Sequence, residues 1–284
     1  MSDQLTRGPL RTAYADVLLA SAGERGVLCD FYDEVAGEIY RDLVQDGDGV
    51  LEARAIAAHV RPGSGPVLEL AAGMGRLTFP FLDLGWEVTA LELSTAVIAA
   101  FRDRLAEAPS DVRDRCTIVQ GDMSAFSLGK RFGTVVISAG SVNVLASSSR
   151  PGLYASVRDH LEPGGKLLFG VPKPPPARPG PESLERKQEF TGRSGRRYVL
   201  HARDIPAEET QEITIHPADE TADPFLVCTH RIWHTAVERV VEELKLAGFD
   251  VNAQSTFAST EAGGGGDDMV LVEAIPREVT ADAK

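Results

Sequence analysis

Short runs of apolar residues alternate along the chain with longer segments in which apolar residues recur at helical spacing. Most of the short runs are rich in Val, Ile and Leu, which is typical of strands buried in a sheet. They occupy residues 67–70, 87–92, 116–120, 134–138, 166–171, 249–255 and 269–274. The segments with helical spacing occupy residues 51–60, 77–84, 95–107, 153–161 and 236–247. This alternation predicts an α/β fold with a mostly parallel sheet.

The regions outside this alternation have patterns of their own. Residues 12–22 and 31–44 carry apolar residues at helical spacing, and Asp30 is the expected N-cap of the second helix. Further strands are expected at residues 186–191, 196–202, 208–216 and 225–233. The first two of these strands flank a glycine turn and alternate apolar with polar residues, so they predict a β-hairpin with one buried face.

These patterns divide the chain into a core, an insertion and two terminal additions. We expect a helical N-terminal cap at residues 1–50 and a disordered tail at 277–284. The α/β core is expected at residues 51–172 and 225–276. Residues 173–224 between its two parts are expected to hold a proline-rich linker, extended and stiff, followed by the β insertion.

Composition and charge exclude several classes of protein. The chain has 284 residues, of which 43% are hydrophobic and 25% are charged, as is typical of a globular protein. The formal net charge of −13 argues against a nucleic-acid partner, because such a partner requires a positive surface. No apolar run is long enough to span a membrane, and the N-terminus lacks the pattern of a signal peptide.

Cysteine is sparse. The three cysteines, Cys29, Cys116 and Cys228, form no C-x-x-C motif. Scattered cysteines in odd number predict buried, reduced thiols in a cytoplasmic protein and give no indication of a metal site. Arg greatly outnumbers Lys and Ala is abundant, which suggests a GC-rich bacterial gene.

Candidate chemistry begins where the first core strand ends. Residues 67–76 read Val-Leu-Glu-Leu-Ala-Ala-Gly-Met-Gly-Arg, which indicates a strand, a glycine turn and the start of a helix. Gly73 and Gly75 lack a Cβ, so the backbone can turn sharply and lie close to a ligand. A single G-x-G is common in ordinary strand–helix turns. Here two further acids follow, because Glu92 closes the second core strand and Asp122 comes just after the third.

This series resembles the class I S-adenosylmethionine-dependent methyltransferases over residues 52–172 and 225–276. The resemblance implies a Rossmann-like sheet of seven strands, S-adenosylmethionine as cofactor and S-adenosylhomocysteine as product. In that family the glycine loop holds the methionine end of the cofactor, the second acid binds the ribose and the third binds the adenine. Carried over by position, the cofactor residues are Glu69, Ala71, Gly73 and Gly75, then Glu92 with Leu93, then Asp122 with Met123.

A dinucleotide-binding Rossmann enzyme is the nearest alternative, since it also uses a glycine turn and an acid on the ribose. Its third glycine, which allows close packing at the pyrophosphate, would fall at Thr78 here. It also has no counterpart of the site at Asp122. Both departures favour the methyltransferase interpretation.

The loop after the fourth core strand is expected to face the transferred methyl group, because ligands of open α/β sheets bind beyond the carboxyl ends of the strands. We assign Ser138 and Ala139 to the cofactor, Ser141 to the substrate and Asn143 to catalysis. The alternative is that Ser141 and Asn143 satisfy backbone groups of the loop. The resemblance is informative here, since methyltransferases of DNA base amines or protein Gln carry an Asn/Asp-Pro-Pro-Tyr-type motif that this loop lacks.

Aromatic residues near the N-terminus supply further candidates. The F-Y-D motif at residues 31–33 is frequent in family members that act on small molecules. We therefore assign Tyr32 to catalysis and Tyr40 to substrate binding. The alternative for both is an amphipathic tyrosine of the core whose hydroxyl reaches water.

The strand at residues 225–233 and the residue after it supply the last candidates. His230 and His234 have the intrinsic pKa of a general base, and Trp233 is assigned to the substrate. His234 is expected to begin the next helix. The alternative for each histidine is a structural role.

The predicted hairpin is basic in an otherwise acidic chain. Its cationic residues are Arg186, Lys187, Arg193, Arg196, Arg197 and Arg203. Such a patch would suit an acidic substrate, with Arg196 as the representative contact. The alternative is a solvated face of the hairpin.

The resemblance narrows further toward methyltransferases of bacterial natural-product clusters, and within them toward those of daptide-type ribosomal peptide pathways. It then implies N,N-dimethylation of a C-terminal peptide amine. Two alternatives stay open: a small-molecule N- or O-methyltransferase of secondary metabolism, and a cofactor-binding protein without catalysis. The expected partner is a peptide or small-molecule amine, with no nucleic acid, no membrane and no metal.

Overall fold

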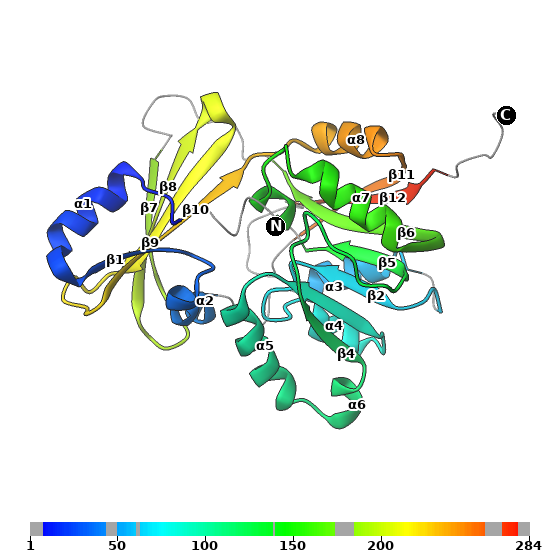
Figure 1. The fold of residues 1–284 in the computed structure, drawn as a ribbon, viewed down its shortest axis with the longest axis horizontal. Helices are drawn as coiled ribbons and strands as arrows, with labels where there is room; N and C mark the ends of the chain where they lie inside the picture. The colour runs from blue at the N-terminus through cyan, green and yellow to red at the C-terminus, as the bar shows by residue number, and fades with distance from the viewer. Residues whose placement is uncertain are drawn as a thin grey trace. The chain divides into compact units, whose positions relative to one another are not determined.

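The computed structural model describes residues 8–43, 50–60, 63–138, 140–173, 185–258 and 269–277. These residues form two compact units (Figure 1). We call the larger one the core unit; it holds residues 50–93, 102–173 and 235–277. The smaller unit holds residues 8–43, 94–101 and 185–234.

The core unit is built on a seven-stranded sheet with the order β11-β12-β6-β5-β2-β3-β4. Its strands are β2 (Val67–Leu70), β3 (Val88–Glu92), β4 (Cys116–Gln120), β5 (Phe132–Ile137), β6 (Leu161–Pro172), β11 (Phe249–Phe257) and β12 (Met269–Pro276). Strands β2 to β6 run parallel, whereas β12 runs antiparallel to both β6 and β11. The seven-stranded α/β fold predicted from the sequence is thereby confirmed.

Helices cover both faces of this sheet because its strands are apolar on both faces. The helices of the core unit include α3 (Val50–Ala57), α4 (Thr78–Asp83), α6 (Ser110–Arg113), α7 (Arg150–His160) and α8 (Val237–Leu246), and α5 (Thr95–Ala106) is shared with the smaller unit. Leu68 packs in the core cluster that contains α7 and α8, while its neighbour Val67 packs in the cluster of α3 and α4. Successive residues of a buried strand thus pack in core clusters on opposite faces of the sheet.

A buried ion pair joins α7 to α8. Arg150 is 2% exposed, and its Nε and Nη2 donate to the two carboxylate oxygens of Glu243 at 2.8 Å each. Its Nη1 donates to the Leu145 carbonyl oxygen at 3.2 Å and to Thr235 Oγ1 at 3.1 Å, and the Tyr154 hydroxyl also donates to Glu243. One guanidinium therefore connects two helices with the segments that precede them.

The smaller unit contains a five-stranded sheet with the order β1-β10-β9-β8-β7. Its strands are β1 (Gly26–Asp30), β7 (Glu185–Thr191), β8 (Arg197–Ile205), β9 (Thr210–Pro217) and β10 (Phe225–Trp233). β7, β8, β9 and β10 pair antiparallel in sequence, and β1 joins β10 in parallel. The predicted hairpin, β7 with β8, and the strand that follows it are confirmed.

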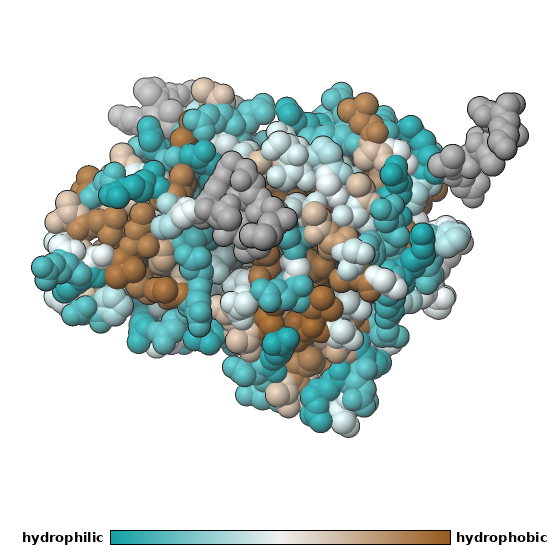
Figure 2. Space-filling model, viewed as in Figure 1, coloured by the Kyte–Doolittle hydropathy of each residue, from teal (hydrophilic) through white to brown (hydrophobic). Residues whose placement is uncertain are grey.

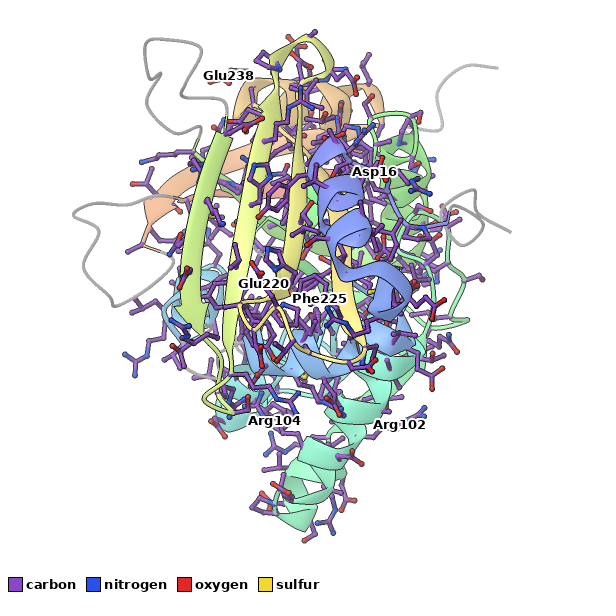
Figure 3. The ribbon with its side chains drawn as sticks, turned by 90° about the vertical axis from the view of Figure 1, so that its left-hand side faces the viewer. Asp16, Arg102, Arg104, Glu220, Phe225 and Glu238 are labelled. Carbon is purple, nitrogen blue, oxygen red and sulfur yellow. The ribbon has the colours of Figure 1, made fainter. Side chains whose placement is uncertain are left out.

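One helix packs on each face of this smaller sheet. α1 (Ala13–Ala22) lies over one face (Figure 3), where Ala15 is buried with Phe225 and Val227. α2 (Gly37–Leu43) packs on the other face, where Ile39 lies among the core residues of the sheet. Hydrophobic residues also gather at the surface over α1 and β1 (Figure 2), and Val17 of α1 is 67% exposed.

Asp42 of α2 fastens the turn of the hairpin. Its carboxylate accepts hydrogen bonds from the Ser194 backbone N–H and hydroxyl, both at 2.6 Å, and from the Tyr198 hydroxyl at 2.7 Å. These donors stabilise the charged carboxylate and hold its pKa below the ordinary value, although burial of Asp42 opposes them.

Two expectations about the smaller unit are wrong. The helix expected at 31–44 begins only at Gly37, because Asp30 Oδ1 accepts from the Tyr32 N–H and Asp33 Oδ2 accepts from the Asp30 N–H, which makes a side-chain-capped turn. The segment before this turn is the strand β1. Strand β10 was expected to return to the core sheet, but it pairs with β9 and β1 instead.

Two expectations lie outside the described residues. These are most of the proline-rich linker and nearly all of the C-terminal tail.

Candidate functional site

The glycine turn follows β2 in an unusual backbone conformation. Gly73 and Gly75 have φ angles of +59° and +84°, and Ala71 has a φ of +53°. The turn is held by hydrogen bonds from Ala72 N to the Leu91 carbonyl and from Gly75 N to the Ala72 carbonyl. A left-handed alanine is strained, and such strain is often found where a backbone is shaped for a ligand.

The strain at Ala71 predicts opposite effects on stability for two neighbouring glycine substitutions. Ala71→Gly removes a left-handed penalty of about 1–2 kcal/mol and adds about 0.4–1 kcal/mol of unfolded-state entropy, so we expect a net gain of roughly 0.5 kcal/mol. Ala72→Gly, beside it, has no positive φ to relieve and loses a buried methyl group, so it should destabilise by about 1 kcal/mol. Urea denaturation of both variants is the measurement, and a loss of stability in Ala71→Gly would contradict the argument.

Glu92, at the end of β3, is oriented toward the glycine turn. Its Oε2 accepts from the Gly73 N–H at 2.9 Å and its Oε1 accepts from the Leu93 N–H at 2.8 Å. The side chain is 8% exposed. The carboxylate is thus fixed beside the turn, where it can accept further hydrogen bonds from a diol.

Glu69, near the end of β2, is buried, with 1% of its surface exposed. The Thr78 hydroxyl donates to its Oε2 at 2.5 Å, and its Oε1 is buried with no hydrogen-bond partner among the described residues. Burial raises the pKa of this carboxyl to about 8, although the Thr78 hydrogen bond and the nearby charge of Arg76 lower it. Thr78 thus stands where a dinucleotide-binding fold has its third glycine, and its hydroxyl donates to Glu69 of the same motif.

The third acid follows β4. Asp122 Oδ1 accepts from the Ser124 N–H at 2.8 Å, which fixes the carboxylate in a turn. Met123 is 6% exposed and belongs to the core cluster of α7 and α8. The structure therefore places all three acids at the carboxyl ends of parallel neighbours β2, β3 and β4.

The loop after β5 contains the last predicted group of the core unit. Ser138 and Ser141 share a hydrogen bond between their hydroxyls at 2.6 Å, and Ala139 lies outside the described residues. Asn143 is 8% exposed, and its Oδ1 is buried without a hydrogen-bond partner in the described part of the chain. Ser141 thus has an internal partner, whereas Asn143 keeps a buried acceptor that no described residue satisfies.

These core-unit residues fit S-adenosylmethionine. Its ribose diol matches the acceptor carboxylate of Glu92. Its ammonium group would favour the charged form of the buried Glu69 carboxyl, whose Oε1 has no hydrogen-bond partner among the described residues. The left-handed turn at Gly73 and Gly75 leaves no Cβ between backbone and ligand.

The smaller unit brings together three of the predicted acceptor residues. The ring of Tyr32 meets the imidazole of His230 edge to face at 4.9 Å, and it lies 5.8 Å from the ring of Tyr40. Phe31 contacts both tyrosines. The Ser94 hydroxyl donates to the Tyr32 carbonyl at 2.7 Å, which ties this aromatic cluster to the start of α5.

His230 is neutral at physiological pH. Its Nε2 is buried and has no hydrogen-bond partner among the described residues, and burial lowers its pKa to about 4. A neutral imidazole with an unsatisfied nitrogen can accept or donate one hydrogen bond to a ligand, depending on its tautomer.

The lowered pKa of His230 predicts a pH dependence of stability. The imidazole is harder to protonate in the folded protein than in the unfolded chain, so its contribution is complete above the unfolded pKa of 6.5 and is lost as the pH falls toward 4. Between pH 7 and pH 5 we expect wild type to lose about 2 kcal/mol that His230→Gln does not lose. Urea denaturation at both values is the test, and parallel pH profiles would contradict it.

The remaining predicted residues of the smaller unit have other surroundings. His234 does not begin a helix, because α8 starts at Val237; its imidazole is 43% exposed and lies 3.3 Å from the Asp204 carboxylate. Trp233, at the end of β10, is partly buried. Arg196 is 68% exposed and pairs with Glu38 at 3.2 Å.

The hairpin arginines are partly neutralised within the unit. Arg197 lies 3.5 Å from Glu189, and Arg203 lies 3.5 Å from Glu185. The basic patch suggested by the sequence is therefore interleaved with carboxylates, which supports the solvated-face alternative.

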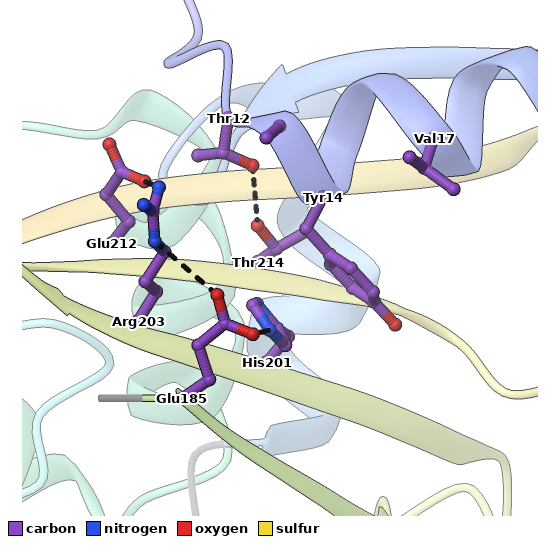
Figure 4. A pocket seen from close by; sticks show the side chains of 9 residues that line it. Thr12, Tyr14, Val17, Glu185, His201, Arg203, Glu212 and Thr214 are labelled. Carbon is purple, nitrogen blue, oxygen red and sulfur yellow. Dashed lines mark hydrogen bonds and ion pairs between the residues drawn. The ribbon is translucent and has the colours of Figure 1, made fainter. Parts of the chain in front are cut away.

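Sequence reasoning missed a pocket of about 310 Å³ beside α1 (Figure 4). Its polar edge is formed by Glu185, His201, Arg203 and Glu212, and Tyr14 stacks on His201 at 4.0 Å. Thr214 in this pocket pairs in register with Thr229, the neighbour of His230. Since adjacent strand residues point to opposite faces, the pocket and His230 lie on opposite faces of the smaller sheet.

Among the described residues, no group of three or more His, Cys, Asp or Glu side chains is arranged to hold a metal ion. No helix in the part of the chain that the structure describes has the length and apolar character to cross a membrane.

Comparison with known proteins agrees with this geometry. The family model described as "Methyltransferase domain" matches residues 67–165. The crystal structure of the glycopeptide N-methyltransferase MtfA with S-adenosylhomocysteine is 64% identical, with a TM-score of 0.64, and the match covers 95% of this chain and 100% of that chain. MtfA has also been solved with S-adenosylmethionine.

Two curated relatives match over shorter stretches. The dTDP-3-amino-3,4,6-trideoxy-alpha-D-glucopyranose N,N-dimethyltransferase of Streptomyces venezuelae is 36% identical over 144 residues, which are 48% of this chain and 57% of the relative. The dTDP-3-amino-3,6-dideoxy-alpha-D-glucopyranose N,N-dimethyltransferase of Streptomyces fradiae is 34% identical over 135 residues, which are 45% of this chain and 49% of the relative. The chain spans about half the length of these curated relatives.

The similarity to MtfA extends over the whole of a protein whose crystals hold the cofactor and its product. The chain therefore belongs to the class I S-adenosylmethionine-dependent methyltransferases, and it is an enzyme with S-adenosylmethionine as its cofactor.

Proposed function

We propose that this enzyme transfers a methyl group to an amine of a glycosylated peptide natural product. The observation that carries the proposal is the 64% identity to the glycopeptide N-methyltransferase MtfA over the full length of that chain. The earlier expectation of a peptide acceptor amine is retained in this form. Its narrower version, a C-terminal amine of a ribosomal peptide, has no support in the comparisons.

In the proposed reaction, S-adenosylmethionine supplies an electrophilic methyl group on a sulfonium. The chain's own residues must hold the cofactor and align the amine. We assign Glu92 to the ribose, Asp122 to the adenine, and Glu69 with the glycine turn to the methionine end. With the donor already activated, alignment of the two reactants supplies most of the rate acceleration.

The amine must be neutral to attack, because an ammonium ion has no free electron pair. His230, with its pKa near 4, is a weak proton acceptor, so it is better suited to hold the neutral amine by a hydrogen bond than to remove its proton. The rings of Tyr32 and Tyr40 beside it make an apolar surrounding that favours the uncharged amine. We therefore assign His230 and Tyr32 to acceptor positioning, and Asn143, with its unsatisfied Oδ1, to a ligand N–H.

The test is mass spectrometry of a glycopeptide whose only amine is N-terminal, incubated with the purified protein and S-adenosylmethionine. We expect the mass increase of one methyl group on that amine, and continued incubation shows whether a second follows. A matched sample whose N-terminal amine is acetylated should gain nothing. Equal methylation of the acetylated sample would contradict an amine acceptor.

A second acceptor class is favoured by the two Streptomyces relatives described above, whose names give amino sugars linked to dTDP as their substrates. The same assay with a dTDP-linked amino sugar separates the two proposals. Methylation of the nucleotide sugar without methylation of the glycopeptide would replace the first proposal by the second.

A further inference from the structure

Two cysteines far apart in sequence meet inside the smaller unit. Cys29 of β1 and Cys228 of β10 are register partners in the parallel pair of strands. Their sulfur atoms are 3.1 Å apart, and the residues are 3% and 1% exposed. Cys116, the third cysteine, lies in β4 of the core unit and is not part of this pair.

This geometry is close to that of a disulfide. An S–S bond is about 2.05 Å long, so the two sulfur atoms need to approach by only about 1 Å. Neighbouring strands are about 4.8 Å apart, which falls within the roughly 4.4–6.8 Å Cα separation of bridged cysteines. A bond between them would require little backbone movement.

Both thiols are buried and therefore protected from oxidants in the fully folded protein. Burial and the neighbouring sulfur raise the pKa of Cys228 well above its ordinary value, so the reactive thiolate is scarce. β1, however, is an edge strand of five residues that pairs only with β10 among the described strands. Edge strands open locally more readily than central ones, and such opening would bring the thiols into contact with an oxidant.

We propose that Cys29 and Cys228 are an oxidation site that closes into a disulfide and fastens β1 to β10. The oxidant is a low-molecular-weight disulfide such as oxidised glutathione. One cysteine thiolate attacks it, which releases one glutathione thiol and leaves a mixed disulfide. The second cysteine thiolate then displaces the other glutathione, so two protein thiols are oxidised and one glutathione disulfide is reduced to two thiols.

The bond would act on the aromatic cluster described above. Cys228 lies two residues before His230 on the same strand, so both side chains lie on one face of the sheet. Cys29 lies three residues before Tyr32, which meets His230 edge to face. The oxidised form therefore holds the strand that leads to Tyr32 against the strand that carries His230. The cross-link itself does not depend on the proposed acceptor.

The test is thiol mapping on the full-length wild-type protein. The protein is incubated with oxidised glutathione, first in buffer and then in urea just below the unfolding transition. Free thiols are then blocked with N-ethylmaleimide, and the peptides are identified by mass spectrometry without reduction. We expect a linked peptide pair containing Cys29 and Cys228, with Cys116 outside it. Separate blocking of Cys29 and Cys228 under both conditions, or cross-linking through Cys116, would overturn the proposal.

A second measurement requires no digestion. A bond between residues this far apart strongly restricts the unfolded chain, so the oxidised protein should melt at a temperature higher by about 5 °C, reversibly with reductant. Cys116→Ser should keep this rise, whereas Cys228→Ser should abolish it. An equal rise in Cys228→Ser would show that oxidation elsewhere is responsible and would overturn the assignment to this pair.

Discussion

Replacing Glu92 by Ala is expected to weaken S-adenosylmethionine binding about 100-fold or more. The carboxylate accepts hydrogen bonds from two backbone N–H groups, Gly73 and Leu93, and it is the group we assign to the ribose diol. A hydrogen bond to a charged group contributes about 1.5–3 kcal/mol, and two such bonds to the ribose give about 3–4 kcal/mol after partial replacement by water. Isothermal titration calorimetry with S-adenosylmethionine is the measurement.

The matched control for this variant is Glu87→Ala. Glu87 is a neighbouring carboxylate whose side chain is 60% exposed and pairs with Lys130, away from the glycine turn. The Glu87→Ala variant removes the same charge and should leave the dissociation constant of S-adenosylmethionine unchanged. A Glu92→Ala protein that is folded by circular dichroism and binds the cofactor within about threefold of wild type would sink the assignment of Glu92 to the ribose.

Replacing Arg150 by Met is expected to destabilise the protein by about 3–5 kcal/mol. The guanidinium is 2% exposed, and its loss takes the bidentate partner from Glu243 and a donor from the Leu145 carbonyl. Glu243 then keeps the Tyr154 hydroxyl and the longer contact to the exposed Arg239, which do not replace a buried guanidinium. Breaking a buried pair from one side costs more than the pair contributes, because one charge stays behind in a poorly solvated place. Urea denaturation of the purified variant gives the loss directly.

Arg239 provides a control on the same carboxylate. It also reaches Glu243, at 3.4 Å, but its side chain is 51% exposed. Arg239→Met should therefore cost less than about 0.5 kcal/mol. Similar losses for Arg150→Met and Arg239→Met would mean that burial does not set the strength of this network. The double variant Arg150→Met with Glu243→Leu should recover part of the loss, since no unpaired charge remains.

The core unit was predictable because each strand carries its signal locally. Residues 135–137, for example, are Val-Val-Ile, and β5 is buried along its whole length. The acids at 69, 92 and 122 were predictable for the same reason, since each lies within two residues of the carboxyl end of such a strand. A local pattern was enough to place them at one edge of the sheet.

The smaller unit was less predictable because its pattern depends on distant partners. β1 is short and only one of its residues is fully buried, so Gly26–Asp30 has no hydrophobic pattern that predicts a strand. Its partner β10 lies far along the chain, since Cys29 and its register partner Cys228 are 199 residues apart. The sequence also could not predict which buried atoms of Asn143 and His230 lack a hydrogen-bond partner among the described residues, because this depends on how the side chains pack.

The pairing of β1 with β10 also has a consequence for synthesis on the ribosome. Cys29 and Cys228 are 199 residues apart, so β1 leaves the ribosome long before its partner exists. At about 5–20 residues per second, the strand waits roughly 10–40 seconds with its apolar neighbour α1 uncovered. The smaller sheet cannot close until the core strands β2 to β6 have been made. The first strand of the nascent chain can therefore reach its place only after most of the chain has been made.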